Sequence, residues 1–181
     1  IKAALDEMKA AGIDNILALR GDIPKNYEGQ VFTDFEHASS LVSLIKEYGD
    51  FCVGGACYPE VHPDSRNKKE DIAGLKRKVD AGCDYLTTQM FFDNQVFYKF
   101  VDRCRAAGIS VPIIPGLKPI STPKQVRLLP ESFSIDIPFE LTSEISAHEN
   151  DRQAVYQIGQ EWATAQCKDL LAHGVPGVHF Y

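Results

Sequence analysis

The sequence predicts an α/β fold in which parallel strands alternate with helices, as in the later part of a (β/α)8 TIM barrel. Short apolar segments typical of buried strands alternate five times with amphipathic helical segments. Polar residues directly follow the first four of these strands, and a barrel collects its site from such loops. The alternative is a doubly wound open sheet, but neither G-x-G-x-x-G nor G-x-x-x-x-G-K-[ST] occurs. We therefore expect roughly the last five βα units, in one partial barrel domain over residues 1–181 with no second domain.

Composition excludes several classes of protein. The chain has 181 residues, of which 44% are hydrophobic, and no apolar run approaches the roughly 18 to 20 residues that span a membrane. We expect a soluble protein without a membrane partner. The formal net charge is -6, which disfavours nucleic acid as a partner. The five cysteines are scattered and form no C-x-x-C pair, so we expect a reducing cytoplasm.

The first half of the chain predicts two helices and two strands. Residues 1–11 place apolar side chains at helical spacing, and Gly12 follows as a stop signal. Residues 15–19 are too short and too apolar for a surface helix, so they predict a strand. An amphipathic helix is expected over 36–48, before a strand over 51–57. Because the chain opens inside a helical pattern without Met, we expect that sequence precedes it.

The middle of the chain repeats this pattern. Asp64 or Ser65 is the predicted N-cap of the next helix, which is expected to end near Gly82. A strand over 85–89 and a helix with its apolar stripe over 96–104 follow.

The last part is predicted in less detail. A strand over 112–116 precedes a short helix through Val126 and Leu129. Residues 130–140 are interpreted as an irregular connection. A long helix from about 151 to 173 then leads to a final strand over 177–181.

The strand over 51–57 leads into the most chemically varied loop. Pro59 and Pro63 restrict the backbone, so Tyr58 and His62 are held on a stiff segment. These side chains predict a binding site, because functional residues concentrate on loops. The alternative is that they only close the strand through local hydrogen bonds.

Charged residues after other strands are further candidates. Arg20 and Asp22 flank Gly21, so a guanidinium and a carboxylate could face one ligand while the glycine permits close approach. The alternative is a local ion pair. Asp71 and Lys78 fall on one side of the next predicted helix, where Lys78 could neutralise a phosphate, although charged runs usually mark a solvated face.

Gln89 ends a strand and could donate and accept hydrogen bonds toward a heteroaromatic ring. Phe91 and Phe92 offer stacking surface or core packing. A metal site built from Asp22, Glu60, His62 and Asp93 is disfavoured because no metal-ligand spacing occurs, so we predict no metal.

Six strings in this order resemble the flavoprotein methylenetetrahydrofolate reductases. The resemblance covers essentially the whole chain. It implies a catalytic (β/α)8 barrel that holds FAD without a covalent bond. The flavin would take a hydride from NADH or NADPH and reduce methylenetetrahydrofolate to methyltetrahydrofolate in one-carbon and methionine metabolism. The strings lie at residues 15–22, 58–63, 75–82, 88–93, 114–116 and 179–181.

The resemblance also assigns roles to residues. Asp22 and Gln89 would be catalytic and would bind the folate, with Gln89 contacting folate and nicotinamide in turn. Further site residues, including a glutamate general acid, would precede Ile1. The implied FAD-binding residues are Arg20, Gly21, Asp22, His37, Ala38, Ala56, Tyr58, His62, Asp71, Arg77 and Lys78.

Two other functions stay open at this stage. The chain could be a truncated, non-catalytic fragment that retains part of a cofactor groove, or it could belong to a metal-dependent, aldolase-like barrel. The sequence does not distinguish NADH from NADPH, and it leaves open a homo-oligomer.

Overall fold

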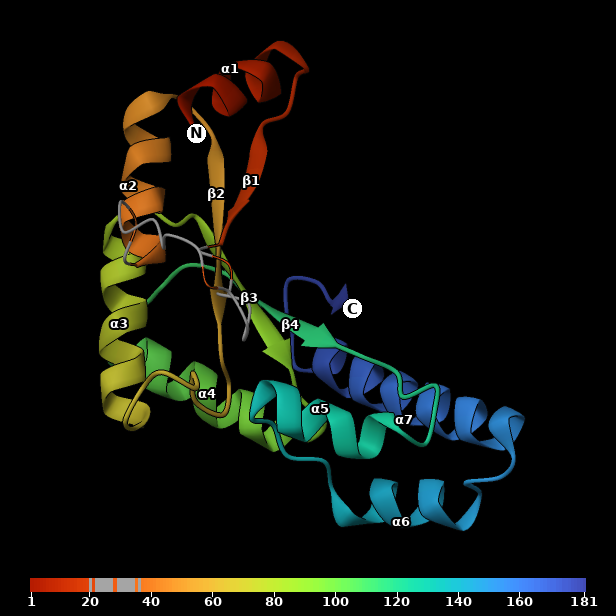
Figure 1. Ribbon diagram of the computed structural model, residues 1–181. Helices are drawn as coiled ribbons and strands as arrows, with labels where there is room; N and C mark the ends of the chain where they lie inside the picture. The colour runs from red at the N-terminus through yellow and green to blue at the C-terminus, as the bar shows by residue number, and fades with distance from the viewer. Residues whose placement is uncertain (20, 22–27, 29–34, 36) are drawn as a thin grey trace.

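The computed structural model describes residues 1–19, 21, 28, 35 and 37–181 (Figure 1). Arg20 and Asp22, both predicted site residues, lie outside the described residues. The elements in chain order are α1 (Lys2–Ala10), β1 (Asn15–Ala18), α2 (Ala38–Tyr48), β2 (Cys52–Cys57), α3 (Lys68–Asp80), β3 (Tyr85–Met90), α4 (Asn94–Ala106), β4 (Ile113–Leu117), α5 (Gln125–Phe133), α6 (Phe139–Ala147), α7 (Arg152–Ala172) and β5 (His179–Phe180).

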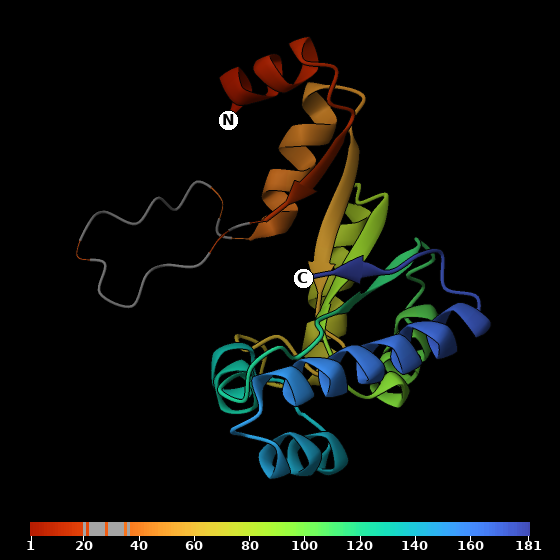
Figure 2. The ribbon, with the colours of Figure 1, turned by 90° about the vertical axis from the view of Figure 1, so that its right-hand side faces the viewer.

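The described strands form one parallel sheet in the order β1-β2-β3-β4-β5. Each strand pairs with the next along the chain, so the order lacks the reversal that defines a doubly wound sheet. The sheet twists and curves as a half-barrel, and α2 and α3 run along one side of it (Figures 1 and 2). The predicted α/β class and parallel sheet are therefore confirmed. The carboxyl ends of all five strands lie at one edge.

The apolar stripes of the helices are buried against this sheet. Val42 and Ile45 of α2 pack on Val53 of β2, and Leu75 of α3 packs near Leu86 of β3. These side chains are at most 6% exposed. Burying an aliphatic side chain of this size contributes about 1.5 to 3 kcal/mol, so the helix positions are determined mainly by packing. In the described part of the chain, no helix is long and apolar enough to cross a membrane.

One predicted helix boundary is wrong. The N-cap of α3 is Asn67, and neither Asp64 nor Ser65 serves as the cap. The Asn67 side chain accepts hydrogen bonds from the backbone N–H groups of Lys69 and Glu70, at 3.1 and 3.0 Å. Asn caps helices as well as Ser or Asp, so local preference alone could not choose among the three positions.

The expected irregular connection over 130–140 is also corrected. Helix α5 continues through Pro130 to Phe133, and the burial of Leu129 in this helix offsets the backbone hydrogen bond that proline cannot donate. Helix α6 begins at Phe139 and was not predicted. Its buried residues, Leu141 and Ile145, have the i,i+4 spacing that indicates a helix.

Helix α7 approaches the segment after β4 closely at Gly159. A Cβ atom added to Gly159 would lie 1.9 Å from the carbonyl oxygen of Ile120. Ile120 is itself buried, so this backbone cannot move aside without disturbing the core.

We predict that Gly159→Ala destabilises the full-length protein. Alanine favours a helix by about 1 kcal/mol over glycine, but the overlap with Ile120 should reverse the sign and cost about 1 to 3 kcal/mol. Denaturant unfolding measures this loss. Gly177→Ala is the matched control, because an added Cβ there meets nothing within 4 Å. A Gly159→Ala protein as stable as its parent would refute the close contact.

Candidate functional site

Strand β2 lets a lysine side chain cross its backbone. A Cβ atom added to Gly55 would lie 2.9 Å from Cδ of Lys78 and 2.9 Å from Sγ of Cys83. A larger residue at Gly55 would therefore displace Lys78. The small side chains predicted for this strand make room for α3.

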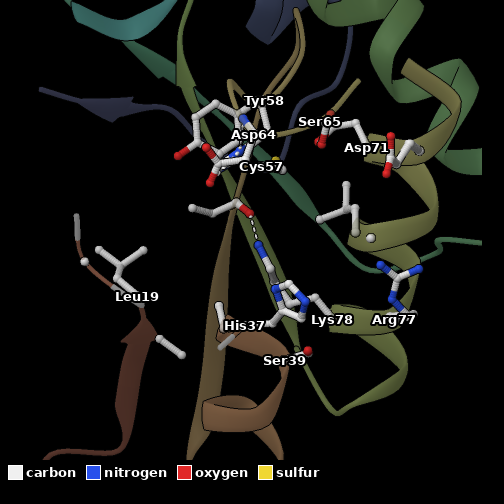
Figure 3. Close-up of a pocket in the computed structure, with 18 residues that line it drawn as sticks. Leu19, His37, Ser39, Cys57, Tyr58, Asp64, Ser65, Asp71, Arg77 and Lys78 are labelled. Atoms are coloured by element: carbon white, nitrogen blue, oxygen red, sulfur yellow. Dashed lines mark hydrogen bonds and ion pairs between the residues drawn. The ribbon is translucent and has the colours of Figure 1, made fainter. Parts of the chain in front are cut away.

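Lys78 uses this space to reach the end of β2. Its Nζ donates a hydrogen bond to the carbonyl oxygen of Ala56 at 2.6 Å (Figure 3). Burial lowers the pKa of the Lys78 amine, and the nearby Cys57, Cys83 and Asp71 oppose that shift. Within the described residues, Lys78 has no carboxylate within 4.0 Å. The site thus holds a partly buried amine that donates to a neutral carbonyl.

The loop after β2 is held by contacts on both sides. The rings of Tyr58 and His62 meet edge to face, with centroids 4.4 Å apart. Nη2 of Arg103, on α4, donates to the carbonyl oxygen of Pro59 at 3.0 Å. Nδ1 of His62 accepts from the backbone N–H of Asp64 at 3.0 Å. These contacts support the prediction of a stiff loop.

Asp71 faces the same site from α3. Ser65 donates to Oδ1 of Asp71 at 3.2 Å. Burial raises the pKa of the Asp71 carboxyl group, while the Ser65 hydroxyl, His62 and Lys78 oppose the rise. Ser65 was predicted only as a helix cap, and its pairing with Asp71 depends on the turn that Asn67 begins.

These elements enclose a cavity of about 380 Å³ between the carboxyl ends of β1 and β2, the start of α2 and one face of α3 (Figure 3). Known small-molecule sites have volumes of about 300 to 1,000 Å³. The cavity brings together nine of the predicted cofactor-binding residues. They are Gly21, His37, Ala38, Ala56, Tyr58, His62, Asp71, Arg77 and Lys78.

The structure places Gln89 apart from these nine residues. Gln89 is on β3, one residue beyond Thr88, which pairs with Cys57 of β2. It therefore reaches the same edge of the sheet as Tyr58 but does not line the cavity. Among the described residues, no three His, Cys, Asp or Glu side chains gather in a way that could hold a metal ion.

Glu60 was weighed only as a metal ligand, and the structure gives it another environment. Both of its carboxylate oxygens accept from the backbone N–H of Asp136, at 3.1 and 2.9 Å. Burial raises the Glu60 pKa to about 7. The Asp136 N–H and Lys68 oppose this rise, whereas the Asp136 and Asp93 carboxylates add to it. Nothing in the local sequence identifies Asp136, 76 residues away, as the partner.

The fold and the site together define an α/β protein with a cavity at the carboxyl ends of its parallel strands. A family model described as "Methylenetetrahydrofolate reductase" matches residues 1–181. The chain belongs to this family, as its sequence strings indicated.

Two relatives illustrate the match. Methylenetetrahydrofolate reductase (NADH) 1 of Arabidopsis thaliana is 41% identical over 194 residues, which cover 100% of this chain and 33% of that protein. The 5,10-methylenetetrahydrofolate reductase of Salmonella typhimurium is 38% identical over 188 residues, which cover 100% of this chain and 62% of that protein. The chain therefore spans about a third of the plant relative and about three fifths of the bacterial one.

A solved structure from Clostridium thermocellum has a similar fold. It superposes with a TM-score of 0.54 at 18% identity, covering 78% of this chain and 50% of that chain. That protein is described as binding two copies of 5-methyl-5,6,7,8-tetrahydrofolic acid. At this identity the likeness supports the fold alone.

We predict that Glu60 makes stability depend on pH. Its carboxyl group ionises near 4.5 when unfolded and near 7 when folded, so the folded state binds more protons between these values. The free energy of unfolding should therefore fall as pH rises through this window. Glu60→Gln lacks this ionisation, so its free energy of unfolding should rise relative to that of the parent as pH increases. The rise should be about 1 to 2 kcal/mol from about pH 5 to about pH 8, a figure reduced for solvent screening at this half-buried group.

Urea unfolding of the full-length protein at both pH values measures this difference. Glu144→Gln is the matched control, since Glu144 is exposed on α6. Equal pH dependence in the parent and in Glu60→Gln would contradict the prediction.

Proposed function

We propose that this chain is part of a flavin-dependent methylenetetrahydrofolate reductase and that its pocket holds FAD in the full-length protein. The observation that carries the proposal is the partly buried Lys78 amine, in a cavity shared with the other eight described residues predicted to bind FAD. A partly buried cation with no carboxylate within 4.0 Å among the described residues favours an anionic ligand, because desolvation otherwise disfavours its charge. The pyrophosphate of FAD is such an anion.

The start of α2 fits the same anion. His37 is the N-cap of α2 and makes no side-chain capping hydrogen bond, and His37, Ala38 and Ser39 line the cavity. The first N–H groups of a helix carry partial positive charge and bind phosphate groups readily. Arg77, on α3, adds a second cation to the lining. Phosphate oxygens in this cavity would thus meet donors from two helices.

The remaining lining residues suit the rest of the cofactor. Asp71 can accept hydrogen bonds from ribose or ribitol hydroxyl groups, and the Tyr58–His62 pair offers aromatic surface to a flat ring. Bound FAD would supply the capacity to accept a hydride from NADH or NADPH and to transfer it to the folate. The chain's own residues would bind and orient the reactants.

We assign Asp22 and Gln89 to the reacting face of the site. Asp22 follows the first predicted strand and Gln89 ends the third, and Gln89 carries an amide suited to pterin or nicotinamide groups. A carboxylate at Asp22 would act on charge that develops during hydride transfer. The relatives' names, which specify reduction of methylenetetrahydrofolate, support this substrate for the full-length protein.

We also propose that the half-barrel is the later part of a (β/α)8 barrel and that residues 1–181 belong to one catalytic domain. The sequential order of the described strands supports this assignment, because strands of a barrel follow one another around its axis. The cavity at the carboxyl ends of β1 and β2 is where barrels place their sites.

We predict that Lys78→Met weakens FAD binding by roughly 1 to 3 kcal/mol, the range for a hydrogen bond to a charged group. Methionine keeps an apolar chain over Gly55 and removes only the charge. Titration of the full-length apoprotein with FAD, followed by flavin fluorescence, measures the affinity. Lys76→Met is the matched control, because Lys76 pairs with Asp80 outside the cavity. Unchanged affinity in Lys78→Met would indicate that no phosphate lies beside this amine.

We predict that Asp22→Asn slows folate reduction about 10²- to 10³-fold while FAD loading stays nearly the same. The amide keeps the shape of the side chain and removes its charge. Stopped-flow measurements should follow nicotinamide oxidation and folate reduction as separate half-reactions. If both half-reactions change equally and little, Asp22 has no special role in the chemistry.

A further inference from the structure

We propose that Thr88, Gly116 and Tyr181 form an interstrand lock that holds a β-bulge in β3 and thereby aims Gln89 at the substrate. The inference rests on the proposed function only in taking Gln89 as a substrate contact. Thr88 and Tyr181 would be positioning residues that act through Gln89. The three residues of the lock come from three of the six sequence strings that indicated the family. The proposed function assigns no role to these three residues.

The bulge lies directly before the end of β3. Thr87 pairs with Ile114 of β4 and Met90 pairs with Gly116, so Thr88 and Gln89 both lie opposite Pro115. The carbonyl oxygen of Pro112 and the N–H of Gly116 face β3, whereas the carbonyl oxygen of Leu117 faces β5. Because backbone groups alternate sides along a strand, Pro115 faces β5 and the proline ring takes no donor away from the β3 ladder. Bulges next to functional sites redirect side chains.

Side chains replace the missing backbone ladder around Thr88. The N–H of Gly116 donates to Oγ1 of Thr88 at 2.9 Å, and the Tyr181 hydroxyl donates to the carbonyl oxygen of Thr88 at 2.8 Å. The Thr88 side chain is completely buried. A buried polar group that loses its partner costs about 1 to 3 kcal/mol, so these bonds strongly favour one conformation of the bulge.

Only glycine fits at position 116, between Thr88 and Tyr181. A Cβ atom at Gly116 would lie 2.4 Å from the Thr88 carbonyl oxygen and 2.6 Å from the Tyr181 ring. The backbone of β4 therefore brings the threonine of β3 and the tyrosine that follows β5 together. The contact joins residues that are 28 and 93 positions apart in the chain.

The lock determines which hydrogen-bonding groups Gln89 presents to a ligand. Oε1 of Gln89 accepts from the backbone N–H of Met90 at 2.9 Å. Nε2 makes no hydrogen bond within the described part of the chain, so its N–H groups are available to a ligand. We therefore infer that the bulge makes Gln89 a donor toward a carbonyl oxygen or ring nitrogen of the substrate.

The test compares Tyr181→Phe with Tyr98→Phe in the full-length protein. Both variants lose one tyrosine hydroxyl, but the Tyr98 hydroxyl bonds Asp169 on α7, away from the bulge. Tyr181→Phe should raise the KM for the folate about fivefold to tenfold without altering flavin content. Tyr98→Phe should not change that KM. In a Gln89→Leu background, Tyr181→Phe should add less than about a twofold effect, because the group it positions is gone.

A second readout needs no activity. The side-chain amide signal of Gln89, assigned by its loss in Gln89→Leu, should shift in the NMR spectrum of Tyr181→Phe and stay in place in Tyr98→Phe. An unchanged signal, or effects on KM that multiply fully in the double variant, would overturn the lock. If the parent reduces no folate, the proposed function fails, and the NMR comparison still decides whether Tyr181 positions Gln89.

Discussion

Close approach of side chains to the sheet backbone is the constraint on which both parts of the site depend. At Gly55 the chain of Lys78 crosses β2 to reach the Ala56 carbonyl, and at Gly116 the Tyr181 ring crosses β4 to reach the Thr88 carbonyl. In each case a polar group from a neighbouring element binds a strand carbonyl near its carboxyl end. Glycine is required because any Cβ would occupy the crossing point.

The arrangement of elements could be predicted largely from local patterns. Apolar runs and amphipathic stripes mark the side chains that become buried. The burial of the same side chains positions α2 and α3 on the sheet, so the sequence pattern and the fold agree for these elements. One prediction was wrong because a local preference competes with burial. Proline normally ends a helix, but the burial of Leu129 keeps α5 intact around Pro130. Whether the helix continues depends on tertiary packing, which a short stretch of sequence does not contain.

The pocket could be predicted from the sequence, whereas the lock could not. Its candidate residues carry recognisable chemistry and directly follow strands or share a helix face, so the rule that strand ends meet at one edge assembles them. That rule does not predict the contacts of Thr88, because Gly116 comes from β4 and Tyr181 from the residue after β5. The partner of Glu60, the Asp136 N–H, is equally remote in sequence.

Strand register connects the two parts of the site. Cys57 pairs with Thr88, so the residue that follows each of them, Tyr58 on the cavity side and Gln89 on the bulge, reaches the edge at the same level. In a sheet, a slip of one residue moves every side chain to the opposite face. The Thr88 bonds to Gly116 and Tyr181 oppose such a slip on one side of β3, and the β2 pairing opposes it on the other. The same contacts that stabilise the sheet therefore align the proposed cofactor pocket with the proposed substrate contact.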